Sequence, residues 1–303
     1  MEYEAMVQSV LEDIDARIME NIHVDELARA QGYSTYHFCR IFMALTGTPV
    51  MSHVTRRKLA YALHDLSRGR RIIDVAMDYG FETHAGFTRA FKRCYGCPPS
   101  LFHLHIPAQP PAKATVYSVK LLHGGFAMQV QIKEIGPFAI VGVTSRHSLP
   151  SVKRSGDIPA YWNTISMDYG KHLERLYDAF TPANHGEYGL CFDVDEVTGE
   201  FNYLLGVAFA DCADAAKIEL DMRKVDIAGG LYAVFTTAIV PKEQYTQSIA
   251  DTWMEILTRW LPASAMYVYD DTRLDFEAYD ERDHGAMVQM DICIPIRKRG
   301  EAK

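Results

Sequence analysis

The feature that most constrains the fold is a repeat near the start of the chain. Residues 27–47 (LARAQGYSTYHFCRIFMALTG) align with residues 75–96 (VAMDYGFETHAGFTRAFKRCYG), at an offset of 48 that becomes 49 after one inserted residue. In each copy a short helical segment is followed by a Gly turn, and a second helical segment ends at another Gly. This order of elements is typical of a helix-turn-helix unit. The sequence therefore predicts two such units.

The second segment of each copy carries the pattern Phe-x-Arg-x-Phe. Phe residues four positions apart lie on one face of a helix and pack inward, which leaves Arg40 and Arg89 facing outward. Ser34 and Thr83 are predicted to cap the two helices. Because an exposed Arg can bind guanine through two hydrogen bonds in the major groove, the pattern predicts that both helices contact double-stranded DNA.

A third helical pattern connects the two copies. Residues 48–69 have apolar side chains at helical spacing, and about 18 residues of helix make a rod of roughly 27 Å. Such a rod holds the two second helices about one DNA turn apart, roughly 34 Å. Arg56, Arg57 and Lys58 on the rod either lie near phosphates or form a solvated charged turn.

The charge of the chain is unevenly distributed. The formal net charge is −8, yet residues 28–106 contain eleven Lys and Arg against four Asp and Glu, a net charge of +7. Residues 107–303 contain nineteen Lys and Arg against twenty-seven Asp and Glu, a net charge of −8. A basic region can face a polyanion that the acidic remainder would repel. The charges therefore favour a nucleic acid partner for the first region alone.

The pattern changes after a Pro-rich segment, IPAQPPAKA at 106–114, which indicates a semi-rigid linker. Later segments are strand-like, with alternation and many β-branched or aromatic residues. Two helical segments interrupt them, near 161–180 and 242–261. The order strand-strand-helix-strand-strand, twice over, predicts an α+β domain with an internal repeat. The predicted divisions are a first domain at 1–106, a linker at 107–127 and a second domain at 128–303.

Residues 80–102 (GFETHAGFTRAFKRCYGCPPSLF) resemble the signature of the AraC/XylS transcription regulators, and the first copy and connecting helix extend the resemblance. The resemblance implies an all-α domain, a homeodomain-like pair of helix-turn-helix units at about 24–46 and 72–95. It also implies that Lys92 touches phosphate and that seven side chains contact the groove or the bases: Tyr36, Cys39, Arg40, His84, Ala85, Thr88 and Arg89. Cys39 and Ala85 stand where relatives often carry long polar residues, so the DNA sequence read is not implied.

The position of this motif adds an expectation. In most AraC/XylS regulators the double motif ends the chain, whereas here it lies at the start, as in the smaller group with a C-terminal sensing domain. The resemblance further implies a cytoplasmic activator whose partners are promoter DNA, a small-molecule effector and RNA polymerase.

The strand-rich region resembles the GyrI-like effector-binding fold. The motifs that carry the resemblance follow in order: IPAYW (158–162), EYGLCFDV (187–194), GGLYAVF (229–235), EILTRWLP (255–262), DFEAYDE (275–281) and DICIPIRK (291–298). The resemblance implies a duplicated ββαββ-type domain in which Glu277 lies in an aromatic cleft and receives a small cationic or amphipathic molecule. Trp162, Tyr188 and Tyr232 are the candidate walls of that cleft.

Physical chemistry supports this role of Glu277 without requiring it. A carboxylate is costly to bury until a cation pairs with it. The residues themselves also allow a surface position for Glu277 and core positions for Trp162 and Tyr232. Trp253 and Trp260, two helical turns apart, are expected to pack in the core.

Other chemistry finds little support in the sequence. No apolar run approaches the ~18–20 residues of a membrane helix, and the acidic start is unlike a signal peptide. Cys94-x-x-Cys97 lacks the second ligand pair of a zinc site. The chain contains no phosphate-binding, dinucleotide-binding or nucleophile motif. We therefore expect no membrane partner, no metal and no cofactor.

Three functions are compatible with this organisation. The first is a transcription regulator that binds DNA and senses a ligand, without enzymatic turnover. The second, which the GyrI-like resemblance implies, is a small-molecule hydrolase fused to a DNA-binding domain, because some GyrI-like proteins hydrolyse reactive molecules with a pocket Glu and aromatic residues. The third is a ligand-independent regulator whose second domain binds a protein. The sequence predicts the first, and it does not identify the promoter, the ligand, the sign of regulation or the oligomeric state.

Overall fold

A computed structural model of the chain divides into two compact units. The first comprises residues 1–99, 108–126 and 258–263, and the second comprises residues 100–107, 127–257 and 264–303. The structure describes these residues of the two units: 2–68, 70–106, 110–116, 130–148, 174–178, 182–195, 198, 200–209, 222–283 and 285–300.

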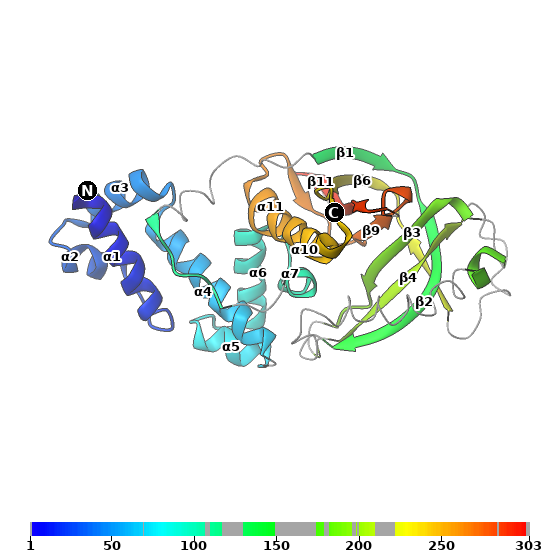
Figure 1. Cartoon of the computed structure of the whole chain (residues 1–303). Coiled ribbons are helices and arrows are strands. Elements are labelled where there is room, and N and C mark those ends of the chain that lie inside the picture. Colours follow the sequence, from blue (N-terminus) through cyan, green and yellow to red (C-terminus); the bar gives the residue numbers. More distant parts are fainter. Residues whose placement is uncertain are drawn as a thin grey trace. The chain divides into compact units, whose positions relative to one another are not determined.

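In the described residues from Glu2 to His105 the chain forms seven helices (Figure 1). Their bounds are α1 Glu2–Ala16, α2 Val24–Ala30, α3 Thr35–Thr46, α4 Val50–Ser67, α5 Ile72–Asp78, α6 His84–Tyr95 and α7 Pro99–His105. The pairs α2–α3 and α5–α6 are the two predicted helix-turn-helix units. The connecting helix α4 has 18 residues, which confirms the predicted rod.

The ends of α3 and α6 are fixed by the residues that the sequence indicates. Ser34 Oγ accepts a hydrogen bond from the backbone N–H of His37 (3.3 Å), and Thr83 Oγ1 accepts one from that of Gly86 (3.0 Å). At the other ends Gly47 and Gly96 adopt left-handed φ angles of 71° and 76°, which side chains other than Gly rarely adopt. Both predicted N-caps are confirmed.

The core of each helix-turn-helix unit is aromatic. Phe38 and Phe42 in α3 are fully buried, and so are Phe87 and Phe91 in α6. Within each helix the two ring centroids lie 6.1 Å apart. Inward packing of these rings fixes the rotation of both helices, because residues four apart share one face.

Polar contacts tie α1 to α4 and to part of the segment predicted as a linker. Arg57 donates to both carboxylate oxygens of Asp15, at 2.6 and 2.7 Å, and both side chains are largely buried. Gln8 donates to the carbonyl of Ala114 and accepts from the N–H of Val116, both at 3.2 Å. Residues 114–116 are therefore held against α1. The domain boundaries given above stay predictions.

The second unit is built on an antiparallel sheet with the order β1-β6-β11-β9-β3-β4-β2-β5, and β8 pairs with β11 (Figure 1). The strands are β1 Val130–Ile135, β2 Phe138–Ser148, β3 Pro182–Phe192, β4 Glu200–Phe209, β5 Met222–Ile227, β6 Gly230–Thr236, β8 Tyr267–Tyr269, β9 Phe276–Tyr279 and β11 Asp291–Lys298. A two-stranded sheet pairs β7 Val240–Pro241 with β10 Met287–Val288.

Short helical elements complete this unit. Helix α10 (Tyr245–Glu255) continues through a π-helical turn, Ile256–Trp260, into α11 (Leu261–Ala263), and α11 belongs to the first unit. Two 3₁₀ turns are Lys242–Gln244 and Glu281–Asp283. Residues 174–178 are the described part of the helical segment that the sequence predicts near 161–180.

The strand order shows the predicted internal repeat. The first repeat consists of β1, β2, β3 and β4, and the corresponding strands of the second repeat are β5, β6, β9 and β11. When each strand is exchanged for its counterpart, the strand order of the sheet is the same read from the opposite end. The centre of this pseudo-two-fold arrangement lies between β3 and β9. There Tyr188 is opposite Ala278, Gly189 is opposite Glu277 and Glu187 is opposite Tyr279. The two repeats therefore meet at the strand that carries Glu277.

Candidate nucleic-acid interface and effector site

The outer face of α3 carries an aromatic and a cationic side chain. Tyr36 is 73% exposed, one turn before the exposed Arg40. The Arg40 guanidinium lies 5.7 Å from the centre of the Tyr36 ring. Cys39 lies between them and is half-buried. The stack orders the Arg40 side chain before any partner binds it.

The outer face of α6 is more basic. Ala85, Arg89 and Lys92 are exposed, whereas His84 and Thr88 are half-buried. Within the described residues, His84 Nε2 and Thr88 Oγ1 have no hydrogen-bond partner. The eight side chains predicted to contact DNA therefore fall on the two helices that follow the Gly turns, and all but the half-buried Cys39, His84 and Thr88 are exposed.

Other cations of the first unit are used internally. Arg57 pairs with Asp15, Lys58 Nζ donates to the carbonyl of Glu20 at 2.9 Å, and the Arg56 guanidinium lies 5.5 Å from the centre of the Tyr95 ring. These contacts favour neither a solvated turn nor a phosphate site for these three residues. Arg40 and Arg89, in contrast, form no ion pair within the described part of the chain.

In the second unit two neutral donors hold the Glu277 carboxylate. Trp253 Nε1 of α10 donates to Oε1 at 2.9 Å, and the Tyr279 hydroxyl donates to Oε2 at 2.7 Å. Trp253 and Tyr279 are 2% and 5% exposed, whereas Glu277 is half-buried. Tyr279 is two residues along β9 and so lies on the same face of the strand. The carboxylate is thus fixed in orientation and partly open.

A glycine makes room beside this carboxylate. A Cβ atom at Gly189, directly opposite Glu277, would lie 2.3 Å from the Tyr203 hydroxyl oxygen and 3.4 Å from Glu277 Oε2. Gly189 therefore lets the Tyr203 hydroxyl approach the centre of the sheet. Trp253 and Tyr279 at the carboxylate, and Tyr203 at the neighbouring Gly189, are aromatic groups that end in polar atoms.

The Glu277 carboxylate has no cationic side chain paired with it in the described residues. Burial raises the pKa of Tyr279 well above its usual range, and the neighbouring Glu277 raises it further, so this hydroxyl stays a neutral donor. Among the residues that the structure describes, no Lys, Arg or His forms an ion pair with Glu277. A carboxylate in aromatic surroundings attracts an organic cation, which gains from both the charge and the ring faces.

Comparison with known proteins gives the family. Residues 27–103 match a family model described as a helix-turn-helix domain. Residues 131–296, more than half of the chain, match the family described as integron-associated effector binding protein. The regulatory protein SoxS of Salmonella typhimurium is 31% identical over 101 residues, which are 33% of this chain and 94% of SoxS. The chain belongs to the AraC family of regulators and carries a GyrI-like effector-binding domain.

Two further proteins resemble parts of this AraC-family chain. The uncharacterised regulator YbfP of Bacillus subtilis is 34% identical over 125 residues, so the chain spans 42% of the length of YbfP and the match covers 41% of the chain. A solved structure of SAV2435 bound to tetraphenylphosphonium is 20% identical, with a TM-score of 0.42, over 56% of this chain and 94% of that one.

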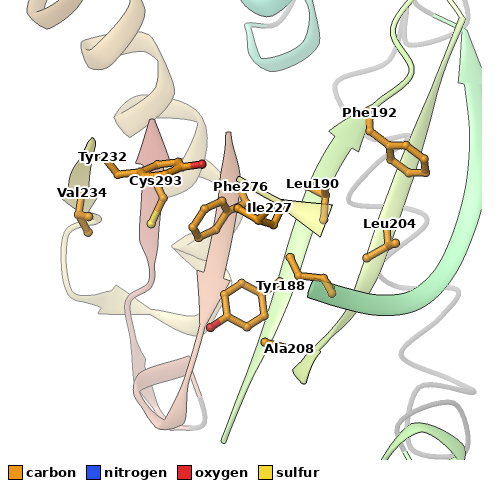
Figure 2. Packing of buried hydrophobic residues seen from close by; sticks show 11 residues of the cluster. Tyr188, Leu190, Phe192, Leu204, Ala208, Ile227, Tyr232, Val234, Phe276 and Cys293 are labelled. Carbon is orange, nitrogen blue, oxygen red and sulfur yellow. The ribbon is translucent and has the colours of Figure 1, made fainter. Parts of the chain in front are cut away.

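The three residues predicted to form the walls of the effector site, Trp162, Tyr188 and Tyr232, are not found around Glu277 in the described residues. Tyr188 and Tyr232 belong to a buried cluster that includes Phe276 (Figure 2). Because Phe276 and Glu277 are consecutive in a strand, this cluster lies on the opposite face of the sheet from Glu277. The structure therefore does not bring Tyr188 or Tyr232 together with Glu277. Trp162 lies outside the described residues.

The residues that do contact Glu277 in the effector-binding domain were missed from sequence. Trp253 was expected only to pack in the core, and it is indeed buried, but its indole N–H reaches Glu277. The spacing of Glu277 and Tyr279 already indicated a shared strand face. No sequence signal indicated Trp253 beside Glu277 or Tyr203 beside Gly189, because these positions depend on the pairing of distant elements.

Neither a membrane helix nor a metal site is found in the part of this AraC-family chain that the structure describes. No helix in the described ranges is long and apolar enough to cross a membrane. The described residues contain no group of three or more His, Cys, Asp or Glu side chains arranged to hold a metal ion.

Proposed function

We propose that this regulator senses a small organic cation, or an amphipathic molecule with a cationic group, at Glu277. The observation that carries the proposal is the half-buried Glu277 carboxylate, held by the neutral donors Trp253 and Tyr279. Such a carboxylate is stabilised when a cation arrives, so ligand binding changes the free energy of the domain.

A direct binding measurement tests this ligand class. Tetraphenylphosphonium is a suitable probe because its permanent charge is surrounded by aromatic rings. We expect isothermal titration calorimetry of the full chain to give saturable binding of tetraphenylphosphonium and much weaker binding of the neutral triphenylphosphine oxide. Equal affinities for the two compounds would contradict the proposal.

We also propose that α3 and α6 contact successive major-groove segments of promoter DNA. Tyr36, Cys39 and Arg40 act from α3, and the contacts from α6 are made by His84, Ala85, Thr88, Arg89 and Lys92. The exposure of Arg40 and Arg89, without ion pairs in the described residues, supports this assignment. Arg89 is assigned to a base and Lys92 to a phosphate.

Arg89→Ala is expected to lower the affinity for a specific promoter fragment by about 1–3 kcal/mol, because a bidentate guanine contact is lost. Lys92→Ala is expected to weaken binding of specific and random DNA equally, and to reduce the salt dependence by about one released counterion. Electrophoretic mobility shift at several salt concentrations measures both effects. An equal loss on specific and random DNA for Arg89→Ala would remove Arg89 as a base-reading residue.

RNA polymerase is the proposed protein partner, with activation as the outcome. Helix α5 presents two exposed apolar side chains one turn apart, Ile73 at 38% and Met77 at 62% exposure. An apolar face of this kind on a DNA-bound domain suits a protein contact. In vitro transcription with Met77→Ser is expected to lose activation while DNA binding is kept. We place this activity in the cytoplasm.

We propose no enzymatic turnover. Both oxygens of Glu277 already accept hydrogen bonds, from Trp253 and Tyr279, which holds the carboxylate in one orientation. This arrangement suits the binding of a cation better than proton transfer.

A further inference from the structure

The C-terminal end of α7 contacts the effector cluster within the second unit. The His105 imidazole stacks on the Trp253 indole, with ring centroids 3.5 Å apart and an interplanar angle of 8°. His105 Nε2 also lies 3.2 Å from Asp275 Oδ2, and each of these two side chains is 10% exposed. His105 therefore occupies one face of the residue that donates to Glu277.

Asp275, the acidic residue in this contact, lies close in sequence to Glu277 of the effector site. Asp275 is two residues before Glu277 in the sequence, and its other carboxylate oxygen accepts a hydrogen bond from the Tyr269 hydroxyl at 3.1 Å. The imidazole thus has an indole face on one side and a carboxylate at its edge. These are the two groups that bind organic cations in proteins.

Both faces of the Trp253 indole ring are covered by other residues. Trp253 is 2% exposed, so an external molecule reaches the indole ring only after a neighbouring group leaves. His105 ends a helix of seven residues, whereas the other groups around Glu277 lie in the sheet or in α10. The end of α7 therefore contacts Trp253 without being part of the sheet.

We propose that His105 is an internal occupant of the effector site, which an incoming cation displaces from the face of Trp253. This proposal rests on the proposed function, because it assumes a cation that uses Trp253 and Glu277. Displacement frees the end of α7, and only Gly96, Cys97 and Pro98 separate α7 from α6. Ligand binding is thereby coupled to the helix that carries Arg89, and the coupling is reciprocal.

The competition has a measurable size. When an internal group closes a site for nine-tenths of the time, the apparent affinity of an external ligand falls about tenfold. Removal of the His105 ring is therefore expected to tighten the binding of a cation by about that factor. A ring that merely forms a wall of the site has the opposite effect, because its removal takes away contacts with the ligand.

Calorimetry of tetraphenylphosphonium binding to the full chain tests the proposal in four proteins. His105→Ala is expected to bind about tenfold more tightly than wild type. His105→Phe keeps a ring on Trp253 and is expected to show no gain. His23→Ala is the matched control, because His23 is exposed and precedes α2 without a side-chain cap. If thermal denaturation shows that His105→Ala is unfolded, His105→Gln gives the same test.

The outcomes separate this proposal from the one on which it rests. Affinity in His105→Ala that equals or falls below wild type overturns the internal occupant and leaves the cation site intact. If only His105→Ala binds the cation, the result supports both the cation site and the internal occupant, and it means that His105 closes the site in the wild type. Absence of binding in all four proteins counts against the cation site itself and so against any competition for it.

Discussion

Glu277→Gln is expected to weaken tetraphenylphosphonium binding by about 2 kcal/mol or more, roughly thirtyfold. The substitution keeps the shape of the side chain and an oxygen that can accept from Trp253, so the change is mainly one of charge. A cation held by a partly buried carboxylate loses its counter-charge and keeps only the aromatic contacts. Calorimetry on the full chain gives the two dissociation constants.

Two controls make this result specific to charge at the site. Glu134→Gln removes a carboxylate from an exposed position in β1 and is expected to leave the affinity unchanged. Triphenylphosphine oxide, which is neutral, is expected to bind Glu277→Gln as it binds the wild type. If the variant and wild type bind the cation equally, Glu277 is not the effector carboxylate.

Arg57→Ala is expected to lower the free energy of unfolding of the first unit by about 3–5 kcal/mol. The Arg57 guanidinium forms a bidentate pair with Asp15, and the two side chains are only 12% and 14% exposed. Removal of the cation leaves a buried carboxylate without its partner, which costs more than the loss of the pair itself. Urea denaturation of the full chain, followed by far-UV circular dichroism, measures the loss of helix.

Arg71→Ala is the matched control for burial. Arg71 also forms a bidentate pair, with Asp74, at 2.7 and 3.0 Å, but its side chain is 79% exposed. Exposed pairs contribute little to stability because water and salt screen them. A loss in Arg57→Ala no larger than that in Arg71→Ala would show that Arg57 is not a structural residue. A large fall in DNA affinity without destabilisation would instead indicate that Arg57 contacts a DNA phosphate.

The helical domain was predictable in detail because its determinants are local. The N-caps Ser34 and Thr83, the left-handed Gly47 and Gly96, and the inward Phe pairs each act within one or two helical turns. A repeated pattern within 100 residues also gives two observations of the same motif. The role of Arg57 was not predictable, since its partner Asp15 lies 42 positions away in the sequence.

The effector domain shows where sequence reasoning ends. The alternation of strands and helices was enough for the fold class, and the strand motif located Glu277. The surroundings of Glu277 depend on strand register, which sets the face that every side chain occupies. For that reason Tyr188 and Tyr232, both aromatic and both in the correct motifs, lie on the other face, whereas Trp253 comes from a helix whose position no local pattern specifies.

A sheet whose strand order reads the same from both ends is what two identical half-domains make when they pair edge to edge. The arrangement is that of a symmetric dimer fused into one chain. Fusion lets the halves differ: Glu187 is buried opposite Tyr279, while Glu277, the next carboxylate across the centre, is half-buried and accepts a hydrogen bond from Trp253. A true dimer must present both carboxylates in identical surroundings, whereas the fused chain can assign one to architecture and the other to recognition.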